Sequence, residues 1–326
     1  MMAKFNETHF DEYLIANERK DLHPKICKMV HPNLPTNIAD LPNTIVYGAK
    51  GVGKYTQVLT ILKRYSQSKL KYEKKLQVNY TNNKTQYFFK LSDIHIEVDM
   101  GLLGCNAKLL WNEIYNQLID ITCIKSNKIF VVVCKNFQDI HSELLDNFYS
   151  YMQTVPYMSI KLVYIIISDQ LSFIPDNILN ICKILPISRP TKTAYTKCIN
   201  KKVPREVKVN DINNIKSLSS GVTQLMKPHA IVCDNILNIM RSHTNISYAR
   251  LRDVCYDIFI YHLDIYECVW YIIDSLILDK LITANNIHKI LVRTYQFFKY
   301  YNNNYRPIYH LENYVLYLIS SISKYD

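Results

Sequence analysis

Residues 48–56 read G-A-K-G-V-G-K-Y-T and fit G-x-x-x-x-G-K, the pattern of a phosphate-binding P-loop. The sequence holds six glycines, and three of them lie within these nine residues. Glycine lets the backbone turn tightly enough for several N–H groups to face one phosphate. The nucleotide-binding residues predicted from this motif are Gly48, Ala49, Lys50, Gly51, Val52, Gly53, Lys54, Tyr55 and Thr56.

The segments on both sides of the motif provide the context that a P-loop needs. Thr44–Tyr47 is a short β-branched and aromatic run that predicts a strand, and residues 55–67 carry apolar side chains at helical spacing. A helix that begins at the loop adds partial positive charge for a phosphate, whose outer oxygens Lys54 would reach. The alternative interpretation is a glycine turn between a strand and a helix, with no ligand.

Tyr55 stands where a P-loop usually carries serine or threonine. In such loops the hydroxyl after the lysine holds Mg²⁺, whereas here the first hydroxyl of that kind is one position later, on Thr56. We therefore expect the loop to bind ATP or ADP, and we expect Mg²⁺ coordination and metal-assisted hydrolysis to be weakened.

Composition indicates a protein of two or three domains in a reducing compartment. The chain has 326 residues, more than one typical domain. Its net charge of +11 suits a polyanion such as nucleic acid, although a basic surface without a partner fits equally. The nine cysteines form no C-x-x-C pair, which argues against a zinc ribbon or a disulfide framework. A polar N-terminus and the lack of a bilayer-length apolar run predict a soluble intracellular protein with no membrane contact.

The segment around and after the loop alternates strand and helix patterns. Two continuous β-branched runs, at 129–133 and 162–167, predict strands buried on both faces of a parallel sheet. This order predicts an open α/β sheet with the phosphate site at the carboxyl ends of its strands. Further predicted strands are 76–80, 86–91 and 94–98, with a turn at Asn82-Asn83; predicted helices are 10–16, 106–119 and 139–153.

Composition changes near residue 188 and again near residue 230. A polar and basic stretch follows Pro190, and we predict a small second domain over residues 189–229. Residues 230–326 contain no glycine and a single proline, Pro307, at the favoured first turn of a helix. Amphipathic helices are predicted there at 233–242, 248–261, 266–278, 286–300 and 308–321.

Three segments resemble one protein family, the small subunits of replication factor C, a sliding-clamp loader of the AAA+ class. Leu41–Thr56 is similar to the family's "LP-H-L-L-V-Y-G-P-x-G-x-G-K-K-T", which also lacks a hydroxyl directly after the P-loop lysine. Ile94–Asp99 resembles "Y-H-L-E-V-N", and Ile308–Val315 resembles "I-Y-H-L-E-A-F-V". Within the family, the similarity is greatest to the subunit numbered three in animals and five in yeast.

The resemblance implies a domain plan and a function. It implies an AAA+ P-loop domain with a parallel sheet over residues 1–188, a small helical lid over 189–229 and an all-helical collar over 230–326. The chain would help to load a sliding DNA clamp onto primer–template DNA within a heteropentamer, so its partners would be other clamp-loader subunits, the clamp and DNA. We expect a nuclear location or, for a viral protein, a cytoplasmic replication site.

Several positions depart from what the resemblance leads us to expect. Lys135 and Asn136 fall where the family carries an acidic pair for Mg²⁺ and for the attacking water, and neither is a carboxylate. Asp139 is the nearest carboxylate after that strand, and we interpret it as a helix N-cap. Ile181 replaces an arginine that reaches a neighbour's ATP, while Asp169 and Gln224 fall at two sensor positions.

These departures predict nucleotide binding with little or no hydrolysis, no catalytic residue and no metal ligand. One alternative is an active AAA+ ATPase in another DNA-maintenance complex. The other is a degenerate AAA+ scaffold that binds no nucleotide.

Overall fold

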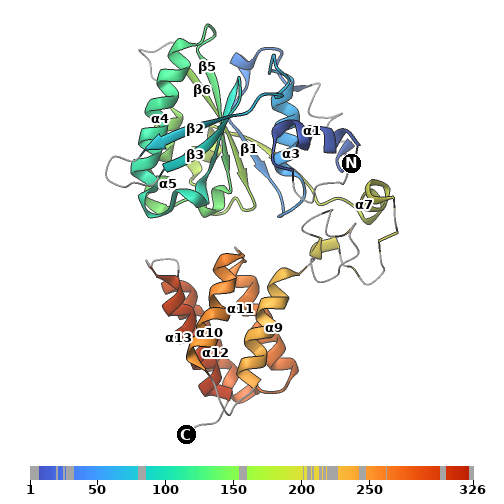
Figure 1. The fold of residues 1–326 in the computed structure, drawn as a ribbon, viewed down its shortest axis with the longest axis vertical. Coiled ribbons are helices and arrows are strands. Elements are labelled where there is room, and N and C mark those ends of the chain that lie inside the picture. Colours follow the sequence, from blue (N-terminus) through green and yellow to red (C-terminus); the bar gives the residue numbers. More distant parts are fainter. Residues whose placement is uncertain are drawn as a thin grey trace. The chain divides into compact units, whose positions relative to one another are not determined.

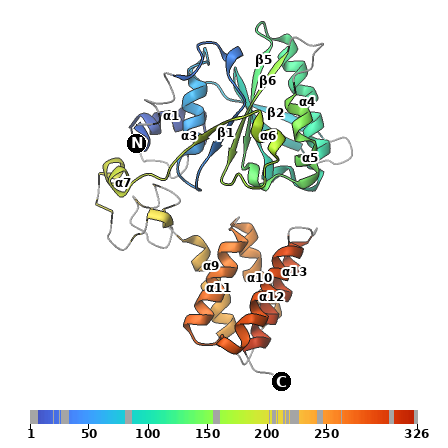
Figure 2. The same cartoon turned by 180° about the vertical axis from the view of Figure 1, so that it is seen from behind.

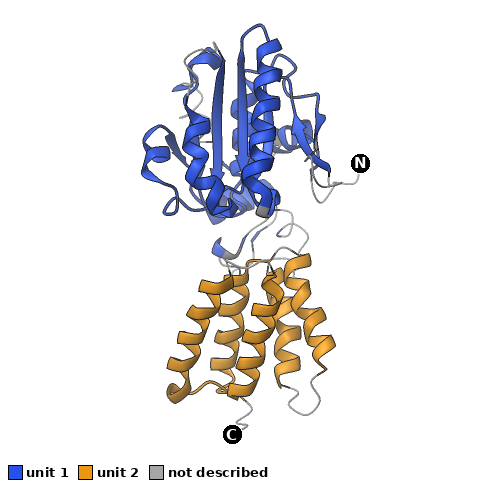
Figure 3. Cartoon of the chain, turned by 90° about the vertical axis from the view of Figure 1, so that its left-hand side faces the viewer, with its two compact units in different colours: residues 1–220 blue, residues 221–326 orange. Residues whose placement is uncertain are grey.

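The structure is a computed structural model of the whole chain, which divides into two compact units, residues 1–220 and 221–326 (Figure 3). The first unit is an α/β domain and the second is built of helices. The finer boundary predicted at residues 188 and 189 stays a prediction. Described residues are 7–19, 21–24, 26, 33–79, 86–153, 160–200, 202, 203, 207, 209–212, 215, 218, 227–241, 247–261, 263–301 and 306–322.

A seven-stranded sheet forms the centre of the first unit, in the order β2-β3-β4-β5-β6-β1-β7 (Figure 1). β4, β5, β6, β1 and β7 run parallel to one another, and β3 pairs antiparallel with both β2 and β4. The predicted α/β fold with a mostly parallel sheet is therefore confirmed. The strands are β1 Thr44–Tyr47, β2 Lys74–Asn79, β3 Gln86–Leu91, β4 His95–Asp99, β5 Ile129–Lys135, β6 Lys161–Ser168 and β7 Lys183–Pro186.

Helices cover both faces of this sheet (Figures 1 and 2). α1 (Phe10–Arg19) and α3 (Lys54–Lys63) pack on one face. α4 (Ala107–Ile124), α5 (Ser142–Met152) and α6 (Asp176–Asn180) pack on the other. Because side chains alternate along a strand, β5 supplies buried residues to both helix layers, as its continuous apolar run predicted.

Aromatic side chains fill the layer between the sheet and α4 and α5. Trp111 of α4 is 1% exposed and lies 5.1 Å from Phe148 of α5, between ring centroids. Phe148 in turn contacts Phe137 and Tyr164 with edge-on geometry. Aromatic groups of this size bury a large apolar area, so they fix the position of these helices on the sheet.

Several predicted boundaries differ from the structure. The interpretation of Asp139 as a helix N-cap is wrong, because α5 begins at Ser142 with His141 as its N-cap and Asp139 ends a short 3-10 turn, Phe137–Asp139. α3 ends at Lys63, four residues earlier than predicted, and α4 continues to Ile124. β7, which follows α6 and pairs with β1, was not predicted.

The segment after β7 forms a small cluster of its own. α7 (Lys192–Ile199) is followed by a 3-10 turn, Val209–Asp211, and the buried side chains of the cluster include Tyr195, Val203 and Ile212. The Arg189 guanidinium donates hydrogen bonds to the carbonyls of Val209 and Ile212, at 3.2 and 3.1 Å. The predicted turn at Asn82-Asn83 and the sensor position Gln224 lie outside the described residues.

The second unit consists of amphipathic helices around one apolar core, as predicted. The hydroxyls of Thr294 and Tyr314 join two of these helices at 2.7 Å inside the core. Trp270 lies on the outer side, 49% exposed. None of the helices in the described parts of the chain has the length and apolar character to cross a membrane. The helices are α9 Pro228–Arg241, α10 Tyr248–Ile260, α11 Ile265–Leu278, α12 Ala284–Tyr301 and α13 Pro307–Ile322.

Candidate nucleotide-binding site

The glycine loop joins the carboxyl end of β1 to the first turn of α3. Gly51 and Gly53 both have left-handed backbone conformations, with φ of 73° and 94°, which side chains other than glycine rarely adopt. Gly53 is the N-cap of α3 and makes no side-chain capping bond. The N–H groups of the first helical turn therefore face the loop without a protein cap, as an anion site requires.

Gly48 is enclosed by backbone. A Cβ at this position would lie 2.4 Å from the carbonyl oxygen of Ile187, the residue after β7. The Ile187 N–H donates a 2.7 Å hydrogen bond to the Tyr47 carbonyl, so the two segments are held together at this point. Only glycine fits here, and the start of the loop is thereby fixed to the end of β7.

Lys54 lies buried in the loop, 8% exposed. Its ammonium group donates to the carbonyl oxygens of Gly48 and Ala49, at 2.8 and 2.9 Å, and forms an ion pair with Asp169. Asp169 follows β6 directly, so the sensor position expected from sequence lies against the P-loop lysine. A phosphate in the loop would compete with these three oxygens for the Lys54 charge.

His23 contacts the loop from the N-terminal segment and was not singled out by sequence. It is buried, and its Nε2 lies 2.7 Å from the carbonyl oxygen of Val52. Its backbone N–H donates to the Asp21 carboxylate, and the Asp21 carbonyl accepts from the Cys198 thiol at 3.4 Å. This short segment therefore links the glycine loop to α7.

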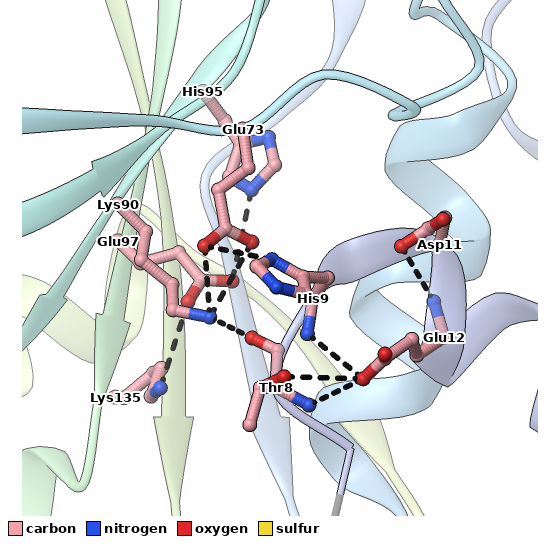
Figure 4. A network of polar contacts seen from close by, with 9 residues as sticks. All are labelled: Thr8, His9, Asp11, Glu12, Glu73, Lys90, His95, Glu97 and Lys135. Carbon is pink, nitrogen blue, oxygen red and sulfur yellow. Dashed lines mark hydrogen bonds and ion pairs between the residues drawn. The ribbon is translucent and has the colours of Figure 1, made fainter.

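Beside the loop lies a buried charged network (Figure 4). Glu97 of β4 is 4% exposed, and its carboxylate lies 3.5 Å from Lys135 Nζ and 3.7 Å from His95 Nε2. Burial alone would raise the pKa of Glu97, but its interactions with His95, Lys135 and Tyr55 outweigh burial, so the pKa lies below its usual value. Glu97 is therefore held as a carboxylate.

Tyr55 connects this network to the P-loop. The Lys135 ammonium lies over its ring, 4.8 Å from the centroid, and the Tyr13 ring of α1 packs edge-on at 4.9 Å. Burial and the carboxylate of Glu97 raise the pKa of Tyr55 far above its usual value, so the phenol stays neutral. Such a cation–π contact stabilises a positive charge near the first turn of α3.

Figure 4 also shows a second group of polar contacts, which includes residues of the N-terminal segment. Glu73 binds Lys90 of β3 at 3.2 Å and His9 at 3.5 Å. Lys90 also donates to the carbonyl of Thr8, whose N–H donates to Glu12 at 2.8 Å. The start of α1 is thus fixed against the strand hairpin, which places Tyr13 against Tyr55.

The residues at the expected metal positions do not suit Mg²⁺. Magnesium requires oxygen ligands in octahedral geometry, usually including a carboxylate. Tyr55 and Lys135 supply a neutral phenol and a cation at the two positions in question. Asp99, at the end of β4, accepts hydrogen bonds from Asn136 Nδ2 at 2.8 Å and from the Gly101 N–H at 3.2 Å. Among the described residues, no group of three or more His, Cys, Asp or Glu side chains could hold a metal ion.

The other predicted positions are distributed around the loop. Ile181, where the resemblance implies an arginine, lies exposed at the carboxyl end of α6, and Asn136 adopts a left-handed conformation after β5. In the loop itself, Gly48, Val52 and Lys54 are buried, Ala49, Gly53, Tyr55 and Thr56 are partly buried, and Lys50 and Gly51 are exposed.

No protein-family profile matches the chain, and no curated protein matches its sequence. The structure itself defines an α/β domain with a mostly parallel sheet and a glycine-rich loop between a strand and a helix.

Proposed function

We propose that the chain binds ATP or ADP at residues 48–56 and serves as a non-hydrolysing, clamp-loader-like subunit of the AAA+ class. One observation carries the nucleotide part: Lys54, the first residue of α3, is buried with its ammonium group against the carbonyls of the loop, next to a helix N-terminus without a side-chain cap and the left-handed glycines Gly51 and Gly53. Backbone N–H groups, the helix N-terminus and a lysine are together the groups that hold nucleotide phosphates.

Weak or absent hydrolysis follows from the side chains around the loop. Hydrolysis needs a carboxylate to activate water and positive groups that stabilise the transferring phosphoryl group. Lys135, the last residue of β5, and Asn136 after it stand where the resemblance implies such carboxylates, and Ile181 stands where it implies the arginine. Nucleotide would therefore act as a structural ligand that organises the loop and α3.

The partners are proposed from the resemblance and from charge. Segments near the P-loop, on β4 and on α13 resemble replication factor C small subunits, and the net charge of +11 suits backbone contacts with DNA. The helical unit would supply contacts to other subunits of the assembly. The proposed partners are other clamp-loader subunits, a sliding clamp and primer–template DNA.

A titration of the full chain with fluorescent ATP and ADP tests the nucleotide part. We expect saturable binding, and we expect Lys54→Ala to weaken it by about tenfold or more, since a charge-assisted bond contributes about 1.5–3 kcal/mol. Lys108→Ala is the control, because Lys108 is an exposed lysine of α4, outside the loop. No binding by the wild type at millimolar nucleotide would support the scaffold interpretation instead.

Two further measurements address hydrolysis and assembly. We expect the isolated chain to show no ATP turnover above that of a Lys54→Ala control; robust turnover that this variant abolishes would favour an active ATPase. Affinity purification of the tagged chain from its native source should recover other AAA+ subunits and a clamp. Recovery of the chain alone would contradict the clamp-loader part.

A further inference from the structure

We infer that Lys135 takes the place of the divalent cation at this site, so that the loop binds a nucleoside di- or triphosphate without metal. The inference rests on the proposed nucleotide site and goes beyond it, because it assigns a phosphate-neutralising role to a residue on a different strand. It starts from the disagreement between magnesium chemistry and the residues at the metal positions.

The strand register places Lys135 at the same edge of the sheet as the loop. Cys134 of β5 is level with Ile166 of β6, and Ile45 of β1 is level with the same residue. Lys135, one residue further on, therefore lies at the carboxyl edge from which β1 enters the glycine loop. Parallel strands bring their carboxyl ends together there, and ligands of open α/β sheets bind at that edge.

Contacts of Lys135 direct its charge toward the first turn of α3. Its ammonium lies over the ring of Tyr55, the residue that directly follows the P-loop lysine. The lysine is about one-third exposed, whereas its counter-ion Glu97 is fully enclosed. A cation on a flexible stem can turn from a buried carboxylate to an entering phosphate, and Glu97 is left with His95 as its neighbour.

Charge balance supports a lysine in this place. Lys54 is paired with Asp169, and Lys135 is paired with Glu97. Both ammonium groups are therefore present without a net positive charge in the free site, and both become available when phosphate oxygens replace the carboxylates. The two departures from the expected magnesium ligands also fit together. Tyr55 stands in place of the expected hydroxyl residue and Lys135 in place of the expected carboxylate, and the Lys135 ammonium lies over the Tyr55 ring.

The test is a titration of the full chain with a fluorescent ADP analogue in excess EDTA and in excess MgCl₂. We expect wild-type dissociation constants in the two conditions to agree within about twofold. Lys135→Met should weaken binding in EDTA by about ten- to a hundredfold, the range for one charge-assisted bond. Lys135→Arg should retain most of the affinity, and Lys108→Met, which removes an exposed charge on the opposite face of the sheet, should leave it unchanged.

A double variant separates a direct contact from a folding effect. Lys135→Met alone leaves Glu97 buried without its lysine, whereas Glu97→Gln with Lys135→Met removes both charges of the pair. If Lys135 binds phosphate, the double variant stays as weak as the single one. Recovery of wild-type affinity in the double variant would overturn the inference, because the role of Lys135 would then be only to neutralise the buried charge of Glu97.

Dependence on magnesium would overturn the inference in a different way. If wild-type binding is lost in EDTA, the nucleotide site stands but Lys135 does not replace the metal. If the Asp169→Asn variant then binds the nucleotide equally well in EDTA and in MgCl₂, Asp169 is identified as the metal ligand. Absence of binding in both conditions refutes the nucleotide site itself, and the inference with it.

Discussion

The substitution Gly48→Ala adds one methyl group, which should force the start of the glycine loop away from the end of β7. The added Cβ would lie 2.4 Å from the Ile187 carbonyl oxygen and 3.3 Å from its carbon, so backbone must move. That movement strains the hydrogen bond from Ile187 to Tyr47. Overpacking costs about 1–3 kcal/mol and a lost backbone hydrogen bond about 1 kcal/mol, so we expect Gly48→Ala to destabilise the α/β unit by about 2–4 kcal/mol.

The assay is thermal unfolding of the full chain, with hydrogen exchange to localise the change. For a unit of this size, about 2–4 °C of melting temperature is lost per kcal/mol, so the shift should be roughly 4–16 °C. The Ile187 amide should exchange faster in the variant. A melting temperature within about 1 °C of wild type, with Ile187 still protected, would refute the steric argument.

Gly53→Asn is the matched control in the same loop. A Cβ at Gly53 meets no atom within 4 Å, and asparagine tolerates the left-handed conformation better than most residues. We expect a loss of about 1 kcal/mol or less, with the Ile187 amide unchanged. An equal loss of stability in Gly48→Ala and Gly53→Asn would mean that contact with Ile187 is not the reason why the loop excludes side chains.

Two predictions concern ionisation. Because the folded-state pKa of Glu97 lies below the usual 4.5, its ionised form adds stability above that pH, and this contribution is lost as pH falls through the lower folded pKa. Glu97→Gln should therefore flatten the acid limb of a stability–pH curve while lowering stability at neutral pH; an unchanged acid limb would contradict the depressed pKa. In native thiol labelling, exposed Cys123 should react first among the cysteines whose side chains the structure describes. Burial raises the pKa of Cys255 to about 12 and that of Cys134 further still, so both should react only on unfolding; rapid modification of Cys134 in the folded chain would contradict its burial.

The strand–loop–helix unit could be predicted because its signals are local. β1 and β5 are continuous β-branched runs, and the glycines between β1 and α3 specify the turn without help from distant residues. The helical unit was predictable for a similar reason, since its apolar spacing is not interrupted by glycine.

β7 and the start of α5 depend on non-local contacts that sequence does not display. β7 has four residues and is mostly exposed or half-exposed, so it shows no alternation, and it exists as a strand because β1 offers it a partner. Asp139 has the chemistry of a helix cap, but the chain first turns at Asn136 and buries Phe137. Packing of that ring against the core delays the helix until Ser142.

The contiguous loop residues of the site were predicted from sequence, but the residues that other elements bring to the loop were not. All nine predicted loop residues lie in one strand–loop–helix segment, whereas Glu97, Lys135 and His23 reach the loop from other elements. A signal for Glu97 was present, since a glutamate between apolar residues of a short strand requires a partner when buried. The partner itself becomes visible only from the register, which sets Lys135 beside β4.

The sequence contains two tryptophans, and each compact unit carries one of them. Trp111 is enclosed among aromatic rings of the α/β unit, while half of Trp270 faces solvent on the helical unit. Their emission should therefore differ in wavelength and in sensitivity to a soluble quencher. With the half-exposed Trp270 replaced in Trp270→Phe, intrinsic fluorescence reports the melting of the α/β unit alone. Superposition of this trace on the loss of helical circular dichroism from the same variant is the behaviour expected if both units unfold in a single cooperative step.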